Sequence, residues 1–424
     1  MAPTDVIEDD FEERTIDGVK MIFQNTPNTE APSEMNTYFP DLKTFWGAEN
    51  IVHSVHNVYT LRGALVRDPL AWANHINVAI YRFGQDAEIL ISSHNWPRWG
   101  NDRVQEVMRA QRDAYMNLNN QVLHLANQGV TINEIHNVYK VPTSLQKQWP
   151  VRQYHGSEFH NSRAVINRYL GYWDANPATL APLSPRDSAP LYVEMMGGAE
   201  KIIAKAQELY DQGKYQHAME IVNKLVFAEP QNQTAKDLLA AIFEQLGYQY
   251  ESTSMRNVHL AAAQELRSGI KKGGAFKSAG PDVVRAMTTQ QWLEALGIRV
   301  DSRKADGMDF TINFITPDNG EKYIVELSGA TLSSIEGYEA DNPDLTVTIN
   351  RGDLEQVMMG KATFGEQIKN GKAKLEGDRK VYEQLMSTLV QFDPLFEIMP
   401  GTKGTVVGEK DDAPFEQSVQ YVGE

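Results

Sequence analysis

The segment GAENIVHSVHNVYTLRGA, residues 47–64, concentrates polar side chains in a stretch that otherwise has the composition of buried chain. The spacing of its aliphatic residues favours a helix. The side chains available for chemistry are one carboxylate, two imidazoles, an amide and a guanidinium: Glu49, His53, His56, Asn57 and Arg62. A carboxylate beside imidazoles indicates either a metal site or a hydrogen-bonded group within the core.

Two further motifs near this segment carry side chains of the ligand type. Glu30 lies in TEAPSEM, and His94 lies in SSHNWPRWG, directly after the apolar strand candidate AEILI. Loops at strand ends can converge on one cleft, and two carboxylates with an imidazole suit zinc. Spacing alone favours an ordinary solvated carboxylate at Glu30 and at Glu49, whereas His94 is not placed as a usual core residue.

The composition limits the function classes that the chain can serve. The formal net charge of -16 over 424 residues argues against a nucleic-acid partner, which attracts basic surfaces. The chain has no cysteine, so thiolate chemistry is excluded. No apolar run is long enough for a membrane span, and the acidic N-terminus is not a signal peptide. The compartment stays open: cytoplasmic as the sequence stands, periplasmic or secreted if a signal once preceded it.

The pattern of strand and helix signals divides the chain into three domains and a tail. Residues 1–155 alternate strand and helix signals, and residues 156–280 are helical, with Gly213, Ala218 and Pro230 placed as in a tetratricopeptide-like hairpin. A unit of that size has more apolar surface than it can bury alone, so we expect it to form a homodimer. Residues 283–405 read as an α+β domain, and residues 406–424 as an acidic tail.

The sequence resembles the alkyl sulfatases of the metallo-β-lactamase superfamily, which hydrolyse dodecyl sulfate and related detergents. The matching motifs are TEAPSEMNTYFP, AENIVHSVHNVYTLRGALVRDPLAW, SSHNWPRWG and HNSRAVINRYLGYWDANPATLAPL. The resemblance implies a multidomain α/β and α protein: the C-terminal half of a metallo-β-lactamase-like αββα sandwich, an all-α dimerisation domain and an α+β domain like sterol carrier protein type two.

The resemblance also assigns roles to particular residues. Glu30 becomes a ligand of one zinc ion, Glu49 bridges two zinc ions, and His94 binds the second. Asn57 and Arg62 are placed beside the sulfate of an alkyl sulfate substrate, because an amide and a planar guanidinium suit an oxyanion. Metal-activated water, rather than a side chain, would be the catalytic group. Arg67 is the alternative cation, with Asp68 as its expected neutralising partner.

One element of the family pattern is missing from the sequence. The family's H-x-H-x-D-H motif would lie upstream of TEAPSEM, yet none of the ten histidines stands at H-x-H spacing. We therefore expect the chain to correspond to the C-terminal portion of the enzyme and to bind zinc weakly. Three readings stay open: a zinc-dependent alkyl sulfatase, a non-catalytic form that keeps the dimerisation and lipid-carrier domains, and a lipid-binding module.

The last domain has a further pattern of apolar residues. They form either the ordinary core of the domain or a pocket for an acyl or alkyl chain. The residues concerned are Met308, Phe310, Phe314, Leu354 and Met358.

Overall fold

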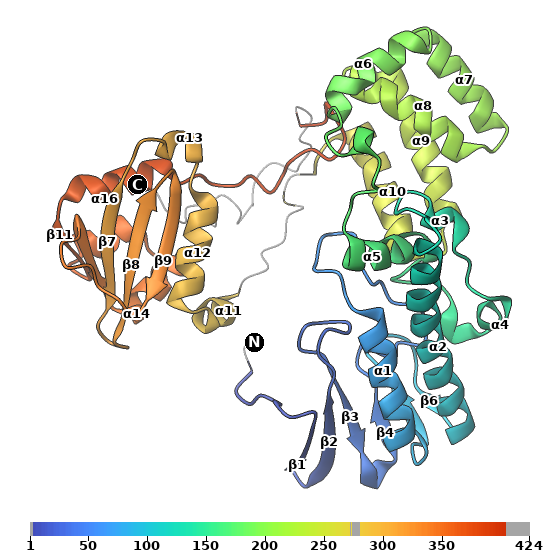
Figure 1. Cartoon of the computed structure of the whole chain (residues 1–424), viewed down its shortest axis with the longest axis horizontal. Helices are drawn as coiled ribbons and strands as arrows, with labels where there is room; N and C mark the ends of the chain where they lie inside the picture. Colours follow the sequence, from blue (N-terminus) through green and yellow to red (C-terminus); the bar gives the residue numbers. More distant parts are fainter. Residues whose placement is uncertain (1–2, 272, 274–279, 404–424) are drawn as a thin grey trace. The chain divides into compact units, whose positions relative to one another are not determined.

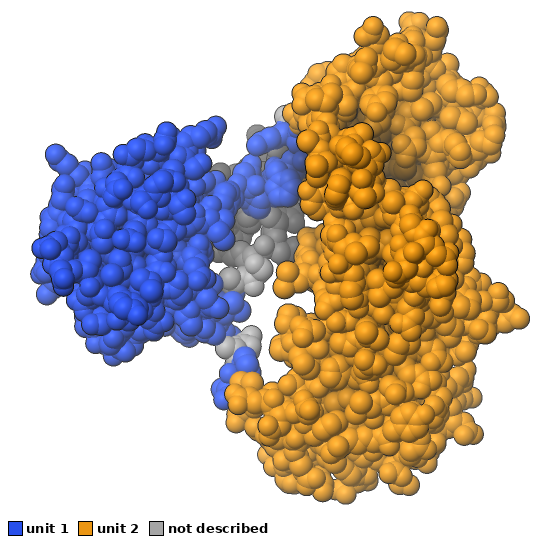
Figure 2. All heavy atoms as spheres, in the orientation of Figure 1, with its two compact units in different colours: residues 1–4, 270–397, 403–424 blue, residues 5–269, 398–402 orange. Residues whose placement is uncertain are grey.

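The computed structural model describes residues 3–271, 273 and 280–403. The chain divides into two compact units, a larger one of residues 5–269 with 398–402 and a smaller one of residues 1–4, 270–397 and 403–424 (Figure 2). The predicted acidic tail, residues 406–424, lies outside the described residues. Among the described residues, no helix combines the length and the apolar character that a membrane span requires.

The larger unit begins with a six-stranded mixed sheet in the order β1-β2-β3-β4-β5-β6 (Figure 1). Strands β1 to β4 are antiparallel, β4 and β5 run parallel, and β5 and β6 are antiparallel. The strands are β1 (Phe11–Ile16), β2 (Val19–Asn25), β3 (Met35–Phe39), β4 (Thr44–Trp46), β5 (Ile89–Ile91) and β6 (Arg98–Trp99).

Two helices pack on this sheet, α1 (Pro69–Ala79) and α2 (Asn101–Ala126), and helix α1 continues into η2 (Ile80–Gly84). Helix α1 begins at Pro69 because Asp68 accepts hydrogen bonds from the backbone N–H groups of Leu70 and Ala71. Period-two alternation sends every second side chain of a strand toward these helices. The resulting core joins strand residues to helix residues: Tyr38, Phe45, Leu90, Trp72, Ile76, Val104 and Met108.

The remainder of the larger unit is helical. Helix α5 packs on α2, while α6 to α10 pack on one another around a separate apolar core. Helices α7 and α8 form the predicted hairpin, with Gly213 at positive φ in the turn. The longer helices are α5 (Glu158–Leu170), α6 (Pro185–Met195), α7 (Ala199–Asp211), α8 (Tyr215–Ala228), α9 (Gln233–Gln249) and α10 (Thr253–Ser268). The short elements are η1 (Pro40–Leu42), α3 (Ile135–Val138), α4 (Thr143–Gln146), η3 (Trp149–Val151) and η4 (Pro177–Thr179).

The smaller unit is an α+β domain, as the sequence predicted. Its five-stranded sheet has the order β11-β10-β7-β8-β9, with β10 and β7 parallel and the other pairs antiparallel. The strands are β7 (Phe310–Thr316), β8 (Glu321–Ser328), β9 (Thr331–Glu336), β10 (Leu345–Ile349) and β11 (Ala373–Gly377). The helices are α11 (Pro281–Ala286), α12 (Thr289–Arg299), α13 (Ser302–Ala305), α14 (Arg351–Met358), α15 (Phe364–Lys369) and α16 (Arg379–Thr388).

Candidate metal centre

The histidine segment, residues 47–64, is a loop and not the helix that its apolar spacing favoured, so that prediction was wrong. Ala48 and His53 both have positive φ, at 44° and 57°, which a helix cannot contain. The loop instead pairs with a distant segment. Val55 N–H donates to the Arg152 carbonyl at 2.8 Å, and Gly156 N–H donates back to the Val55 carbonyl at 2.9 Å. These long-range bonds outweigh the local helical preference.

Glu49 and His94 meet because the strands that precede them are parallel neighbours. Glu49 follows β4 and His94 follows β5, so both side chains leave the same edge of the sheet. His94 Nε2 lies 3.0 Å from Glu49 Oε1, and His56 Nε2 lies 3.4 Å from Glu49 Oε2. The hydrogen bond from His56, followed by the charge of His56 and the contact with His94, lowers the pKa of Glu49 to about 2 despite partial burial.

A third imidazole, His155, completes this group and was missed from the sequence. Its ring centroid lies 4.7 Å from that of His56 and 4.6 Å from that of His94. Its Nε2 is buried and has no hydrogen-bond partner among the described residues. Burial, with the neighbouring His56 and His94, lowers the pKa of His155 to about 4.

The position of His155 depends on the glycine that follows it. A Cβ at Gly156 would lie 2.2 Å from the carbonyl oxygen of His56 and 2.7 Å from Asn161 Nδ2, so only glycine allows the two segments to approach. Asn161 also stabilises the approach of the two segments, because its Nδ2 donates to the His56 carbonyl at 3.0 Å. A His-Gly pair after an aromatic residue carries no specific sequence signal, which is why the residue was missed.

On the other side of His56, Glu30 forms an ion pair with Arg67. Arg67 Nη1 also donates to the carbonyl of Asn57 at 2.7 Å and to its Oδ1, and lies 3.0 Å from His56 Nδ1. Burial lowers the pKa of Arg67 below its ordinary value, although Glu30 acts in the opposite direction. Arg62 is exposed and makes no hydrogen bond or ion pair with other described residues.

A third carboxyl group, Glu34, stands close to Glu30 and Glu49. Burial, followed by the charges of Glu30 and Glu49, raises the pKa of Glu34 to about 7, although a hydrogen bond from the Met35 N–H acts in the opposite direction. The side chain lies in the TEAPSEM motif but the sequence pattern did not distinguish it from a solvated glutamate. The site therefore holds Glu30, Glu49, Asn57 and His94, to which the sequence assigned roles, and His56 and Arg67, whose roles it left open. Two further groups, Glu34 and His155, were missed from the sequence.

The donors form two overlapping groups that suit a metal ion. His56, His94 and His155 make one group, and Glu30, Glu49 and His56 make the other, with the ligand-type atoms of each group within 4.8 Å of one another. Imidazole nitrogens and carboxylate oxygens are zinc ligands, and the unpaired Nε2 of His155 is a nitrogen that a metal would satisfy. The side chains of this chain therefore fit a zinc ion.

His53 does not belong to either group. Its side chain is buried, and neither ring nitrogen has a hydrogen-bond partner among the described residues. Burial, with the positive charge of Arg98, lowers the pKa of His53 to about 4. The ring is thus held neutral in the loop.

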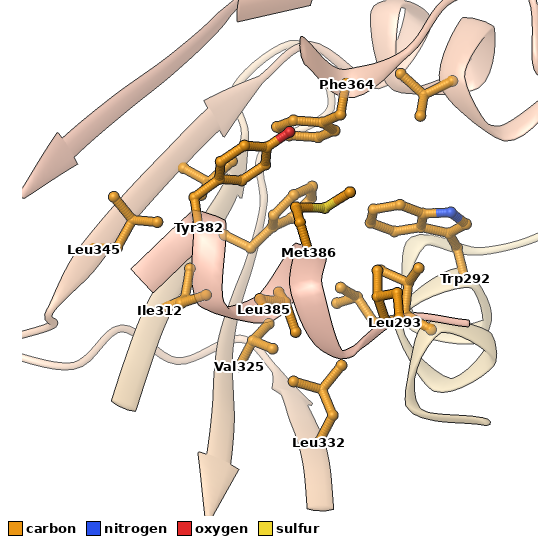
Figure 3. A pocket seen from close by; sticks show the side chains of 15 residues that line it. Trp292, Leu293, Ile312, Val325, Leu332, Leu345, Phe364, Tyr382, Leu385 and Met386 are labelled. Carbon is orange, nitrogen blue, oxygen red and sulfur yellow. The ribbon is translucent and has the colours of Figure 1, made fainter. Parts of the chain in front are cut away.

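The smaller unit contains a separate apolar cavity of about 60 Å³ between its sheet and helices α12 and α16 (Figure 3). Of the five residues suggested for a pocket, only Phe314 lines it. Phe310 and Leu354 are buried in the core, and Met308 and Met358 pack against that core. The side chains visible around the cavity in Figure 3 include Trp292, Leu293, Ile312, Val325, Leu332, Leu345, Phe364, Tyr382, Leu385 and Met386.

Comparison with known proteins agrees with this architecture. Residues 131–269 match the alkyl sulfatase dimerisation family, and residues 277–401 match the alkyl sulfatase C-terminal family. A linear primary-alkylsulfatase of Pseudomonas sp is 41% identical over 94% of this chain and 59% of its own length. An alkyl/aryl-sulfatase of Saccharomyces cerevisiae is 37% identical over 96% of this chain and 62% of its own length.

A solved structure extends the similarity to three dimensions. The stereoselective inverting sec-alkylsulfatase Pisa1 from Pseudomonas sp. matches with a TM-score of 0.89 and 39% identity, over 94% of this chain and 63% of that one. This match confirms the predicted multidomain fold. The chain thus spans about three fifths of the length of these relatives.

Proposed function

The chain belongs to the alkyl sulfatase family, and we propose that it hydrolyses primary alkyl sulfates such as dodecyl sulfate to an alcohol and sulfate at a zinc-dependent site. Relatives of similar identity include a linear primary-alkylsulfatase at 41% and an (R)-specific secondary-alkylsulfatase at 39%, so the position of the ester along the alkyl chain is part of the proposal. The domain bounds 1–155, 156–280 and 283–405 are likewise proposed.

The observation that supports this function most strongly is the position of Glu49 between His56 and His94. A carboxylate held by two imidazoles beside a second carboxylate, Glu30, is a set of donors for a divalent cation. We assign Glu30, Glu49 and His94 as metal ligands on this basis. When bound, zinc would supply a Lewis acid at this cluster.

The protein's own groups would bind and orient the sulfate. Arg67 engages the Oδ1 of Asn57, which leaves the amide nitrogen of Asn57 as the donor available to an oxyanion. Arg62 follows on the same loop and is exposed, so its guanidinium is free to meet a charged group arriving from solvent. The net charge of -16 repels an anionic substrate, and a local cation offsets that repulsion.

The test is release of inorganic sulfate from dodecyl sulfate by the zinc-supplemented chain. Arg62→Ala should lower kcat/KM about ten- to a hundredfold, the value of one charge-assisted contact, and leave zinc content unchanged. Arg103→Ala, which removes an exposed arginine on α2, is the matched control and should change neither quantity. Sulfate release from dodecan-2-yl sulfate alone would contradict the preference for primary esters.

The alternative is a chain without hydrolytic activity that dimerises and binds alkyl chains. The observation that favours this second role is the apolar cavity of the smaller unit, whose lining side chains offer contacts to methylene groups. At about 60 Å³ the cavity would have to widen for a dodecyl chain, which the flexible Met386 at its wall can permit. A fluorescent acyl probe that binds the full chain and is displaced by dodecanol, without any sulfate release, would favour this alternative.

A further inference from the structure

We propose that this chain binds one divalent transition-metal ion on His56, His94 and His155, and that Arg67 takes the place of a second metal ion. The inference rests on the proposed function, because both place a metal at this cluster. It differs in the ligands, since His56 and His155 take the places of Glu30 and Glu49 beside His94, and it gives one ion where the family resemblance implies two.

Three separate segments deliver the three imidazoles. His56 comes from the loop after β4, His94 from the loop after β5, and His155 from the segment between η3 and α5. Their ligand-type nitrogens lie within 4.8 Å of one another, although the residues are up to about a hundred positions apart in sequence. Three imidazoles with one open position are a known ligand set for catalytic zinc. An ordinary core is filled by aliphatic side chains, so packing alone does not require three imidazoles to converge.

Hydrogen bonding at His56 is compatible with metal binding. A ligating imidazole usually donates its second N–H to a carbonyl or carboxylate, which fixes the tautomer. His56 Nδ1 lies 3.4 Å from the backbone oxygen of Asn57, which can accept that proton. Arg67 Nη1 does not depend on His56, because the carbonyl oxygen and Oδ1 of Asn57 both accept from it. Glu49 supplies a negative charge beside the imidazoles.

The second donor group already contains a cation. Glu30, Glu49 and His56 are also close enough to share an ion, but the guanidinium of Arg67 is paired with Glu30 and contacts His56. A divalent ion there would have to displace a largely buried guanidinium and leave its charge unpaired, which is strongly unfavourable. We therefore infer a stoichiometry of one.

The experiment measures metal stoichiometry and ligand type on the full chain. Equilibrium dialysis against Zn²⁺ should give one equivalent, and the zinc X-ray absorption spectrum should show about three imidazoles. His155→Ala should weaken binding by more than about a hundredfold, because loss of a mere outer-shell partner already costs 10–100-fold. His217→Ala, an exposed histidine of α8, is the matched control, and Glu30→Gln should keep one equivalent. Arg67→Met should free Glu30 and allow a second, weaker equivalent on Glu30 and Glu49, because His56 already holds the first ion.

The outcomes separate this inference from the proposed function. Two equivalents in the unsubstituted chain, or undiminished binding by His155→Ala, would overturn the inference. Binding that is lost in Glu30→Gln but kept in His155→Ala would leave the ligands of the proposed function standing and refute this set. If one ion binds to three imidazoles and no sulfate is released, this inference stands and the proposed function is refuted. The absorption spectrum needs no substitution, so misfolding of a variant cannot hide the result.

Discussion

The guanidinium of Arg67 is ion-paired with the carboxylate of Glu30, and the two side chains are only 12% and 13% exposed. The sequence suggested a different partner, the adjacent Asp68. That carboxylate instead caps α1 and forms an ion pair with Arg168 at 2.7 Å. Arg67 is thereby directed into the cluster of carboxylates and imidazoles, where its charge meets Glu30.

Arg67→Ala should lower the free energy of unfolding by about 3 kcal/mol, because it leaves the carboxylate of Glu30 unpaired in a site with little solvent. The matched control is Arg152→Ala, which breaks the exposed pair with Glu251 and should cost less than about 1 kcal/mol. Urea denaturation of both variants measures the difference. Equal losses would show that Glu30 is solvated.

Gly156→Ala should destabilise the chain by about 1–3 kcal/mol and weaken metal binding together, because the new Cβ would push the His155 segment away from His56. Gly352→Ala in α14 is the control, since a Cβ there meets no atom within 4 Å and should be neutral or slightly stabilising. Thermal melts and zinc titrations provide the two measurements. A Gly156→Ala chain that melts and binds zinc like its parent would refute the close approach.

Acid should destabilise the protein through His160. Burial lowers the pKa of His160 to about 4, and neither ring nitrogen has a hydrogen-bond partner among the described residues. As the pH falls below about 6.5, the unfolded chain takes up this proton first, so stability is lost progressively until about pH 4. His160→Met removes the group. Relative to the parent, its unfolding free energy should rise by up to about 3 kcal/mol across that window.

The exposed His217 serves as the control for this prediction. The unfolding free energy of His217→Met should follow that of the parent at every pH, because this exposed side chain is solvated in both the folded and the unfolded chain. Unfolding curves collected between pH 7.5 and pH 4 decide the matter. Parallel pH profiles for His160→Met and the parent would mean that His160 titrates normally in the folded state.

The dimer predicted for the helical domain should depend on α6. Leu191 and Met195 stand four residues apart on one face of this helix and are 59% and 77% exposed. A Leu191→Glu, Met195→Glu double variant should sediment as a monomer at micromolar concentration, because charges at an apolar interface are costly. Ile298→Glu, at a residue 73% exposed in the smaller unit, should leave the dimer intact. A parent chain that is itself monomeric would contradict the dimer.

The sequence predicted the elements whose signal is local. The strand ending at Ile91 and the helical hairpin with its turn at Gly213 follow from the local pattern, and the structure confirms them. The histidine loop was predicted wrongly because bonds to residues 152–161 determine its backbone. Local pattern contains no information about such partners.

The same reason explains the gaps in the candidate site. His94 was expected from its place after a strand and from the family resemblance, and Glu49 from the resemblance alone, whereas His155 is brought into place by the approach at Gly156. The sequence paired Arg67 with its neighbour Asp68, but the Asp68 carboxylate instead accepts the hydrogen bonds that cap α1. The cavity of the smaller unit likewise depends on which helices cover the sheet, so only Phe314 of the suggested residues lines it.

The proposed hydrolysis of alkyl sulfates by this chain, at a metal site around Glu49 and its imidazoles, is tested most directly by zinc-dependent sulfate release from dodecyl sulfate. The full chain should release sulfate with added Zn²⁺ and stop when a chelator removes it. Glu49→Gln should lose at least about a hundredfold in rate, since it removes the charge that joins His56 and His94. Sulfate release that persists in Glu49→Gln, or that is insensitive to the chelator, would contradict the account.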